Sequence, residues 1–214
     1  MDEFNLFFLI IKLVFLFTSV SSSTDVDYND LVKRDGLYYQ KFNDKPFTGN
    51  STGIEKGNIK KGLRNGTWSK YYENGKLDVK GNHKDGKKFG KFVRFNENGQ
   101  LYAEIYYKDD KLEGEYLLYW SNGQLEIKSK YKDGKKFGEF LRYYKNGQLL
   151  YKKYYENNKR DGQQLQYYEN GKIKLKSNYK DGRYDGKFSR YSITGQLEKT
   201  HIYRKGKLIE TILP

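Results

Sequence analysis

The sequence has no cysteine, two prolines and a single alanine, Ala103, and each shortage excludes a class of structure. Without cysteine the chain cannot form disulfides, a thiolate nucleophile, a cysteine-rich zinc site or a lipid-modified N-terminal cysteine. Helical proteins use alanine heavily, so its near absence argues against a helical fold. The chain instead has 22 tyrosines and 22 glycines in 214 residues, a composition that indicates strands joined by tight turns.

The charge is strongly unbalanced, with a formal net value of +14. Residues 1–24 and residues 25–46 each carry −1, which leaves +16 for residues 47–214. Such a charge favours anionic partners, whether acidic protein, lipid headgroup or nucleic acid. A second interpretation also stands, in which lysines occupy solvent-facing strand positions and keep a sheet soluble and its edges unpaired.

The first 24 residues are set apart by an apolar run from Phe4 to Phe17, followed by small polar residues. The run is short for a membrane span, which needs about 20 residues. Its length, its position and the serines after it are typical of a secretory signal peptide, with cleavage after Ser21 or Ser23. We therefore expect an exported protein, in the periplasm, at the cell surface or secreted. The acidic start and Lys12 within the run leave an uncleaved membrane anchor as the alternative.

From Tyr71 onward the sequence repeats six times with a period of 24 residues and no insertions. Copy three reads "YWSNGQLEIKSKYKDGKKFGEFLR" and copy five reads "YYENGKIKLKSNYKDGRYDGKFSR". A degenerate earlier copy begins at Phe47. The six regular copies begin at Tyr71, Phe95, Tyr119, Tyr143, Tyr167 and Tyr191. The sequence thus divides into a leader (1–24), a lead-in or N-terminal cap (25–46) and a repeat region (47–214).

Each copy contains two turn signals, which are Asn74-Gly75 and Asp85-Gly86 in the first copy. Asn-Gly readily adopts the two positive φ angles of a type I′ turn, the favoured two-residue hairpin connection. Asp-Gly is a second turn former that tolerates positive φ. Two turns and two strands in each copy predict an all-β fold, an elongated single antiparallel meander of 24-residue hairpins.

The strands between the turns alternate in character, so each strand should have two different faces. Leu77 shares parity with His83, and later copies have tyrosine in the position of His83. Those tyrosines are Tyr107, Tyr131, Tyr155, Tyr179 and Tyr203. In the second strand a glycine such as Gly90 stands two residues before an aromatic such as Phe92, with Gln164 the exception in the aromatic column. A recurring strand glycine indicates a β-bulge, here one that lengthens the second turn.

The consensus "YYxNGxLxxxxxYKDGKxxGxF" resembles the MORN repeat variant, a degenerate relative of the membrane occupation and recognition nexus repeat. The preceding "DGLYYQKFNDKPFTG", from Asp35 to Gly49, resembles the lead-in of YwqK-family antitoxins, and the whole resemblance covers residues 35–214. It implies a β-rich repeat scaffold without enzymatic activity and, in some members, neutralisation of a partner toxin. Export departs from a purely cytoplasmic antitoxin and suggests a periplasmic or surface role.

No catalytic or metal-binding constellation stands out. His83 and His201 occupy different columns of distant copies, and the aspartates of the Asp-Gly signals already serve turns. Neither a Gly-x-Ser-x-Gly motif nor a phosphate-binding Gly-Lys-Ser or Gly-Lys-Thr is present. We therefore expect no enzyme, no cofactor and no metal. Residues 25–60 are the least repetitive, and they serve either as a cap for the sheet or, through "KPFTG", in partner capture.

The sequence favours a non-enzymatic scaffold that binds another protein, acidic or a toxin, because tyrosine and phenylalanine bring contact area at low entropic cost. The alternative is binding of an anionic membrane surface or a cell-wall glycan through the basic aromatic sheet. Nucleic acid fits the charge, but export argues against it. Open sheet edges also allow two chains to pair as a homodimer. The candidate partner-binding residues are Tyr107, Tyr131, Tyr155, Tyr179, Tyr119, Tyr143 and Tyr167.

Overall fold

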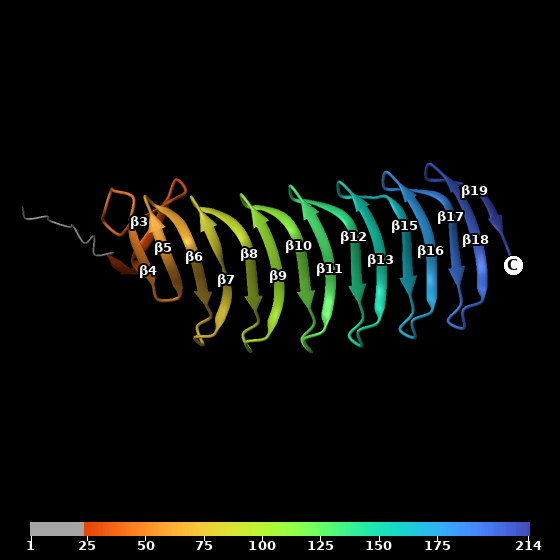
Figure 1. Cartoon of the computed structure of the whole chain (residues 1–214), viewed down its shortest axis with the longest axis horizontal. Helices are drawn as coiled ribbons and strands as arrows, with labels where there is room; N and C mark the ends of the chain where they lie inside the picture. The colour runs from red at the N-terminus through yellow and green to blue at the C-terminus, as the bar shows by residue number, and fades with distance from the viewer. Residues whose placement is uncertain (1–23) are drawn as a thin grey trace, which may run out of the picture.

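The computed structural model describes residues 24–214, and all their strands except β2 and β3 form one long sheet, side by side in a row (Figure 1). This confirms the all-β fold predicted from the repeat. The elements are β1 (Asp25–Asp27), the 3-10 turn η1 (Tyr28–Asp30), β2 (Leu31–Arg34), β3 (Leu37–Gln40), β4 (Gly49–Thr52), β5 (Glu55–Lys60), β6 (Leu63–Tyr71), β7 (Leu77–Lys84), β8 (Lys87–Phe95), β9 (Leu101–Lys108), β10 (Lys111–Tyr119), β11 (Leu125–Lys132), β12 (Lys135–Tyr143), β13 (Leu149–Glu156), β14 (Lys159–Arg160), β15 (Gly162–Tyr167), β16 (Ile173–Lys180), β17 (Arg183–Tyr191), β18 (Leu197–Arg204) and β19 (Lys207–Ile212).

From β4 to β19 the chain is a continuous antiparallel meander, as the repeat predicts. Each strand pairs with the one before it, and β14 and β15 together form one partner of β13. The exception is β1, which runs parallel to β4 with Asp25 opposite Asn50 and forms the N-terminal edge. β2 and β3 form a separate hairpin. The expected signal or anchor segment lies, apart from Thr24, outside the described residues, and residues 24–214 contain no helix with the length and apolar character of a membrane span.

The Asn-Gly connections are not the predicted type I′ turns. Between β6 and β7, Gly75 has a φ of +78°, whereas Asn74 stays outside the left-handed region. The Gly75 N–H donates to the Tyr72 carbonyl, and the Tyr72 N–H donates to the Lys76 carbonyl, so the loop is one residue longer than a type I′ turn. Asn74 acts through its side chain: Oδ1 accepts from the Lys76 N–H, and Nδ2 donates to the Glu97 carbonyl of the next copy at 3.1 Å. The amide therefore joins adjacent copies.

The Asp-Gly connections are the two-residue turns with two positive φ angles. Asp85 and Gly86 have φ of +49° and +80° and join β7 directly to β8. Asp109 and Asp110 adopt the same conformation, at +50° and +65°, because aspartate tolerates the left-handed region. The prediction of a type I′ turn is therefore wrong for Asn-Gly, and the Asp-Gly turns have the two positive φ angles instead.

The recurring strand glycine is a β-bulge, as predicted. Gly114 has a φ of +94° and lies where the register between β9 and β10 shifts, between Leu112 and Tyr116. The bulge stands within the strand, beyond the two-residue turn. It therefore leaves the turn length unchanged, contrary to the prediction, and increases the local twist of the strand.

The hydrophobic core lies at the N-terminal end of the sheet. Val26, Tyr38, Phe47, Ile59 and Trp68 form one buried cluster, in which Ile59 is fully buried. β1 and the β2–β3 hairpin contribute the first two of these side chains, and β5 and β6 contribute the last two. Phe47, from the "KPFTG" stretch, is itself a core residue. The non-repetitive segment therefore packs on the first strands of a sheet that continues as a single layer (Figure 1).

The substitution Gly81→Ala should be strongly destabilising, because Gly81 lies directly under the ring of Phe92. A Cβ on Gly81 would stand 2.3 Å from Phe92 Cδ1, and Gly81 has no positive φ, so the cost is steric. We expect the free energy of unfolding to fall by about 3 kcal/mol. Gly90→Ala is the control: its φ is +73° but no atom lies within 4 Å, and it should cost about 1 kcal/mol. Urea denaturation measures both, and equal losses would contradict the steric account.

Candidate binding site

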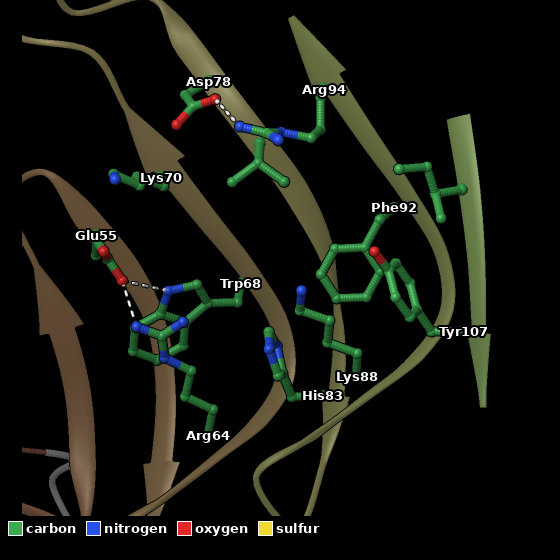
Figure 2. A pocket seen from close by; sticks show the side chains of 12 residues that line it. Glu55, Arg64, Trp68, Lys70, Asp78, His83, Lys88, Phe92, Arg94 and Tyr107 are labelled. Atoms are coloured by element: carbon green, nitrogen blue, oxygen red, sulfur yellow. Dashed lines mark hydrogen bonds and ion pairs between the residues drawn. The ribbon is translucent and has the colours of Figure 1, made fainter. Parts of the chain in front are cut away.

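A cavity of about 320 Å³ opens on one face of the sheet near its N-terminal end (Figure 2). We call the face that carries Trp68, Phe92 and Tyr107 the groove face. Cross-strand partners point to the same side of a sheet, so the strand register extends this face from copy to copy. Phe92 lies opposite Ile105, and Ile105 in turn lies opposite Tyr116. The cavity in Figure 2 is therefore one part of a continuous surface.

Aromatic rings contact one another in pairs along the groove face. The rings of Phe92 and Tyr107 have centroids 5.1 Å apart and an interplanar angle of 76°. This edge-to-face arrangement is an attractive geometry for two aromatic rings. Equivalent pairs recur in the next copies, with Tyr116 and Tyr131 at 5.5 Å and Phe140 and Tyr155 at 6.0 Å. The two aromatic columns of the repeat therefore alternate along the sheet, and each of these rings contacts a ring of the other column.

A cationic side chain lies over these rings at matching positions of several copies. In each case the residue stands near the start of the second strand of a hairpin, just after the two-residue turn. The pairs are Lys88 with Tyr107 (4.8 Å), Lys136 with Phe140 (5.1 Å) and Arg160 with Tyr179 (4.7 Å), measured from Nζ or Cζ to the ring centroid. Cations within about 6 Å of a ring centroid are attracted by its negative face. The groove face thus combines apolar rings with positive charge.

The N-terminal wall of the cavity is a buried ion pair. Glu55 is 9% exposed, and its Oε2 accepts hydrogen bonds from the Arg64 guanidinium and from the Trp68 indole N–H, the latter at 3.1 Å. Arg64 also donates to the Tyr38 hydroxyl at 2.8 Å and lies 4.3 Å over the Trp68 ring. These contacts tie the cap to the first repeat strand, and they neutralise Glu55 and Arg64 mutually (Figure 2).

His83 forms the floor between the wall and the rings. Burial, followed by the positive charges of Arg64 and Lys88, lowers the pKa of His83 to about 4, so the imidazole is neutral at physiological pH. Its ring packs edge-on against Phe92 with centroids 5.4 Å apart. His83 therefore behaves as one more aromatic of the column. Within residues 24–214 no group of three histidine or acidic side chains is placed to hold a metal ion.

Both faces of the sheet carry ion pairs, and the groove face also pairs Arg94 with Asp78 and Arg142 with Glu126. On the opposite face, lysines pair with glutamates of the neighbouring strand: Lys91 with Glu104, Lys128 with Glu115 and Lys152 with Glu139. Of the groove-face cations, Lys88, Lys136, Lys153 and Arg160 have no carboxylate of residues 24–214 within ion-pair distance. The groove face therefore holds positive charge that is available to a ligand.

The structure divides the predicted tyrosines between the two faces. The groove face has the half-buried Tyr107, Tyr131 and Tyr155, together with Tyr179, which is 7% exposed. Tyr119 points to the opposite face, where its hydroxyl lies 3.5 Å from Glu104, and Tyr143 and Tyr167 occupy the equivalent strand ends. The seven side chains therefore cannot all contact one partner surface on a single face.

Sequence reasoning missed the cations over the rings, Lys88, Lys136 and Arg160. Their signal is positional: each stands four residues before the aromatic column of the second strand. Because lysine also fills solvent-facing positions throughout the repeat, that column alone does not separate a ring-stacked lysine from a solvated one.

Comparison with known protein families places the chain in a structural class. Five segments match the MORN repeat variant: residues 64–85, 90–109, 112–133, 138–157 and 160–181. The chain therefore carries MORN-variant repeats across residues 64–181, which confirms the resemblance of the consensus and makes it a repeat scaffold, a kind of protein that is generally not catalytic. The matches do not reach Asp35–Gly49, on which the resemblance to YwqK-family antitoxins rests. No curated protein matches the sequence.

Proposed function

We propose that this protein is a non-enzymatic scaffold that binds an acidic partner protein on its groove face. The observation that carries the proposal is the series of groove-face cations, Lys88, Lys136 and Arg160, which lie over aromatic rings and have no carboxylate of residues 24–214 within ion-pair distance. Rings bring contact area and the unpaired cations bring attraction for an acidic surface. The resemblance of the lead-in supports a toxin as that partner, neutralised by occlusion. The apolar N-terminal run supports an encounter outside the cytoplasm, with the protein exported or membrane-anchored.

Affinity capture of the tagged full-length protein from its own cells tests the proposal, with washes at low and high salt. We expect one stoichiometric acidic protein that survives high salt. The combined variant Tyr107→Ser, Tyr131→Ser, Tyr155→Ser should retain the strand signal in circular dichroism but lose the partner more than about tenfold, because it removes groove-face rings.

The matched control is the opposite-face variant Tyr119→Ser, Tyr143→Ser, Tyr167→Ser, which should keep the partner. Equal retention by the two variants would refute the groove face as the binding surface. Recovery of salt-labile lipid or glycan, with no stoichiometric protein, would replace protein binding by surface binding through the same cations.

A further inference from the structure

One copy of the repeat departs from the others at two groove-face positions at once. At the N-terminal end of the sheet an aromatic ring of the second strand lies over a glycine of the first strand, Trp68 over Gly57 and Phe92 over Gly81. The ring column holds Trp68, Phe92, Tyr116, Phe140 and Phe188, but Gln164 in the fourth copy. The facing column holds Gly57, Gly81, Ile105, Ser129, Ser177 and His201, but Lys153 in that same copy. In the fourth copy the amide Gln164 therefore stands where other copies have an aromatic ring. Lys153 stands in the facing column, where other copies have glycine, serine, isoleucine or histidine.

The exchange leaves a second cavity on the groove face, with a volume of about 150 Å³. Lys153, Arg160 and Gln164 line it together with Tyr184 and other aromatic residues. Gln164 is 5% exposed, and its Nε2 donates to the Tyr154 carbonyl at 3.2 Å. Its Oε1 is buried and has no hydrogen-bond partner among residues 24–214. This oxygen needs a hydrogen-bond donor, which a carboxylate does not supply, so the case for an anion rests on the cations of the cavity.

The cavity also concentrates positive charge without a counterion. Lys153 lies opposite Phe140 on the adjacent strand, and Lys136 stands over the Phe140 ring. Burial, followed by the positive charges of Arg160 and Lys136, lowers the pKa of Lys153. Arg142 adds to the same field but is itself paired with Glu126 at 2.9 Å. Like charges held this close repel one another, and an anion bound between them would remove that repulsion.

We propose that the cavity around Lys153 accepts a carboxylate side chain, aspartate or glutamate, from the acidic partner. A carboxylate can accept hydrogen bonds from the Lys153 ammonium and from the Arg160 guanidinium, whose Nη1 is already held by the Tyr179 hydroxyl at 2.6 Å. The rings of Tyr184 and Phe188 line the cavity beside these donors and suit the methylene stem of an acidic residue. The proposal rests on the proposed function and names the chemistry that the partner presents.

Substitutions that restore the residues of the other copies test the site while preserving the fold. Lys153→Ser and Gln164→Phe each install the residue that other copies have, so both variants should fold as stably as the parent. Titrated at low salt with a fluorescent oligo-glutamate peptide, the full chain should bind the peptide about tenfold more tightly than either variant. Lys130→Ser is the matched control, since Lys130 is exposed on the opposite face, and it should bind like the parent.

Two further measurements test whether the ligand bound at Lys153 is a carboxylate. Nuclear magnetic resonance of the Lys153 ammonium should show its pKa rising when the peptide binds, because a carboxylate stabilises the charged form. Unchanged affinity in Lys153→Ser, or an unmoved Lys153 pKa, would overturn the carboxylate site, whereas the groove-face tyrosine variants decide the proposed function separately. Stronger competition by inorganic phosphate than by unlabelled glutamate peptide would overturn the choice of carboxylate.

Discussion

Acidification from pH 6.5 to pH 4 should remove about 3 kcal/mol of the protein's unfolding free energy through His83 alone. The folded state holds His83 neutral down to about pH 4, whereas the unfolded chain protonates it near pH 6.5. Between these values the unfolded state binds more protons, so stability rises with pH and is lost as the pH falls. The main cause is burial, because the imidazole is 7% exposed beneath the rings of the groove face.

The variant His83→Tyr isolates this effect, because tyrosine is the residue of the later copies at the same position. Urea denaturation at pH 6.5 and pH 4 should give a stability loss that is about 3 kcal/mol smaller in His83→Tyr than in the parent. Glu139 and Asp161, whose pKa values are lowered chiefly by Lys152 and Lys180, supply an acid-side loss common to all variants. The same loss in His83→Tyr as in the parent would rule out a buried neutral imidazole.

Trp68→Ala should lower the free energy of unfolding by about 3–5 kcal/mol, the typical cost of removing a buried tryptophan. Trp68 is 3% exposed, packs over Gly57 and belongs to the core that joins the cap to the repeats. Removal of the side chain leaves a cavity. It also removes the indole N–H that donates a hydrogen bond to Glu55. The cap and the first repeat strand should therefore lose their shared packing.

Trp120→Ala is the matched control for that prediction. Trp120 is half-buried and donates its indole N–H to the Tyr143 carbonyl at 3.2 Å, outside the core cluster. Its loss should cost about 1–2 kcal/mol, the value of a partly exposed ring and one hydrogen bond. Urea denaturation of both variants compares them. A Trp68→Ala loss no larger than the Trp120→Ala loss would show that the N-terminal cluster is not the main core.

The sequence predicts the meander well because each strand pairs with its neighbour in the chain, so local signals carry nearly all the topology. Turn type is different. Asn74-Gly75 suits a type I′ turn by composition, yet the extra loop residue lets a single left-handed glycine close it and frees the asparagine to bond the next copy. The parallel strand β1 has three residues and no periodic pattern, so only its pairing with β4 reveals it.

The site was predicted only in part, for a physical reason. The alternation of side chains along a strand places Tyr107 on one face of the sheet. The face on which Tyr119 lies depends instead on the bulge and register with a neighbouring strand. Gln164 stands out in the sequence as an exception to the aromatic column. Its relation to Lys153 does not, because the two residues lie on different strands and meet only in the folded sheet.

Photo-crosslinking in the cells of origin tests most directly whether a protein partner occupies the groove face. A photoreactive residue placed at Leu112, opposite Tyr107 on the groove face, is compared with one at Leu117, opposite Glu104 on the other face. We expect the probe at Leu112 to crosslink to one protein and the probe at Leu117 to give no crosslink. Crosslinking from Leu117 alone, or equally from both positions, would contradict this expectation.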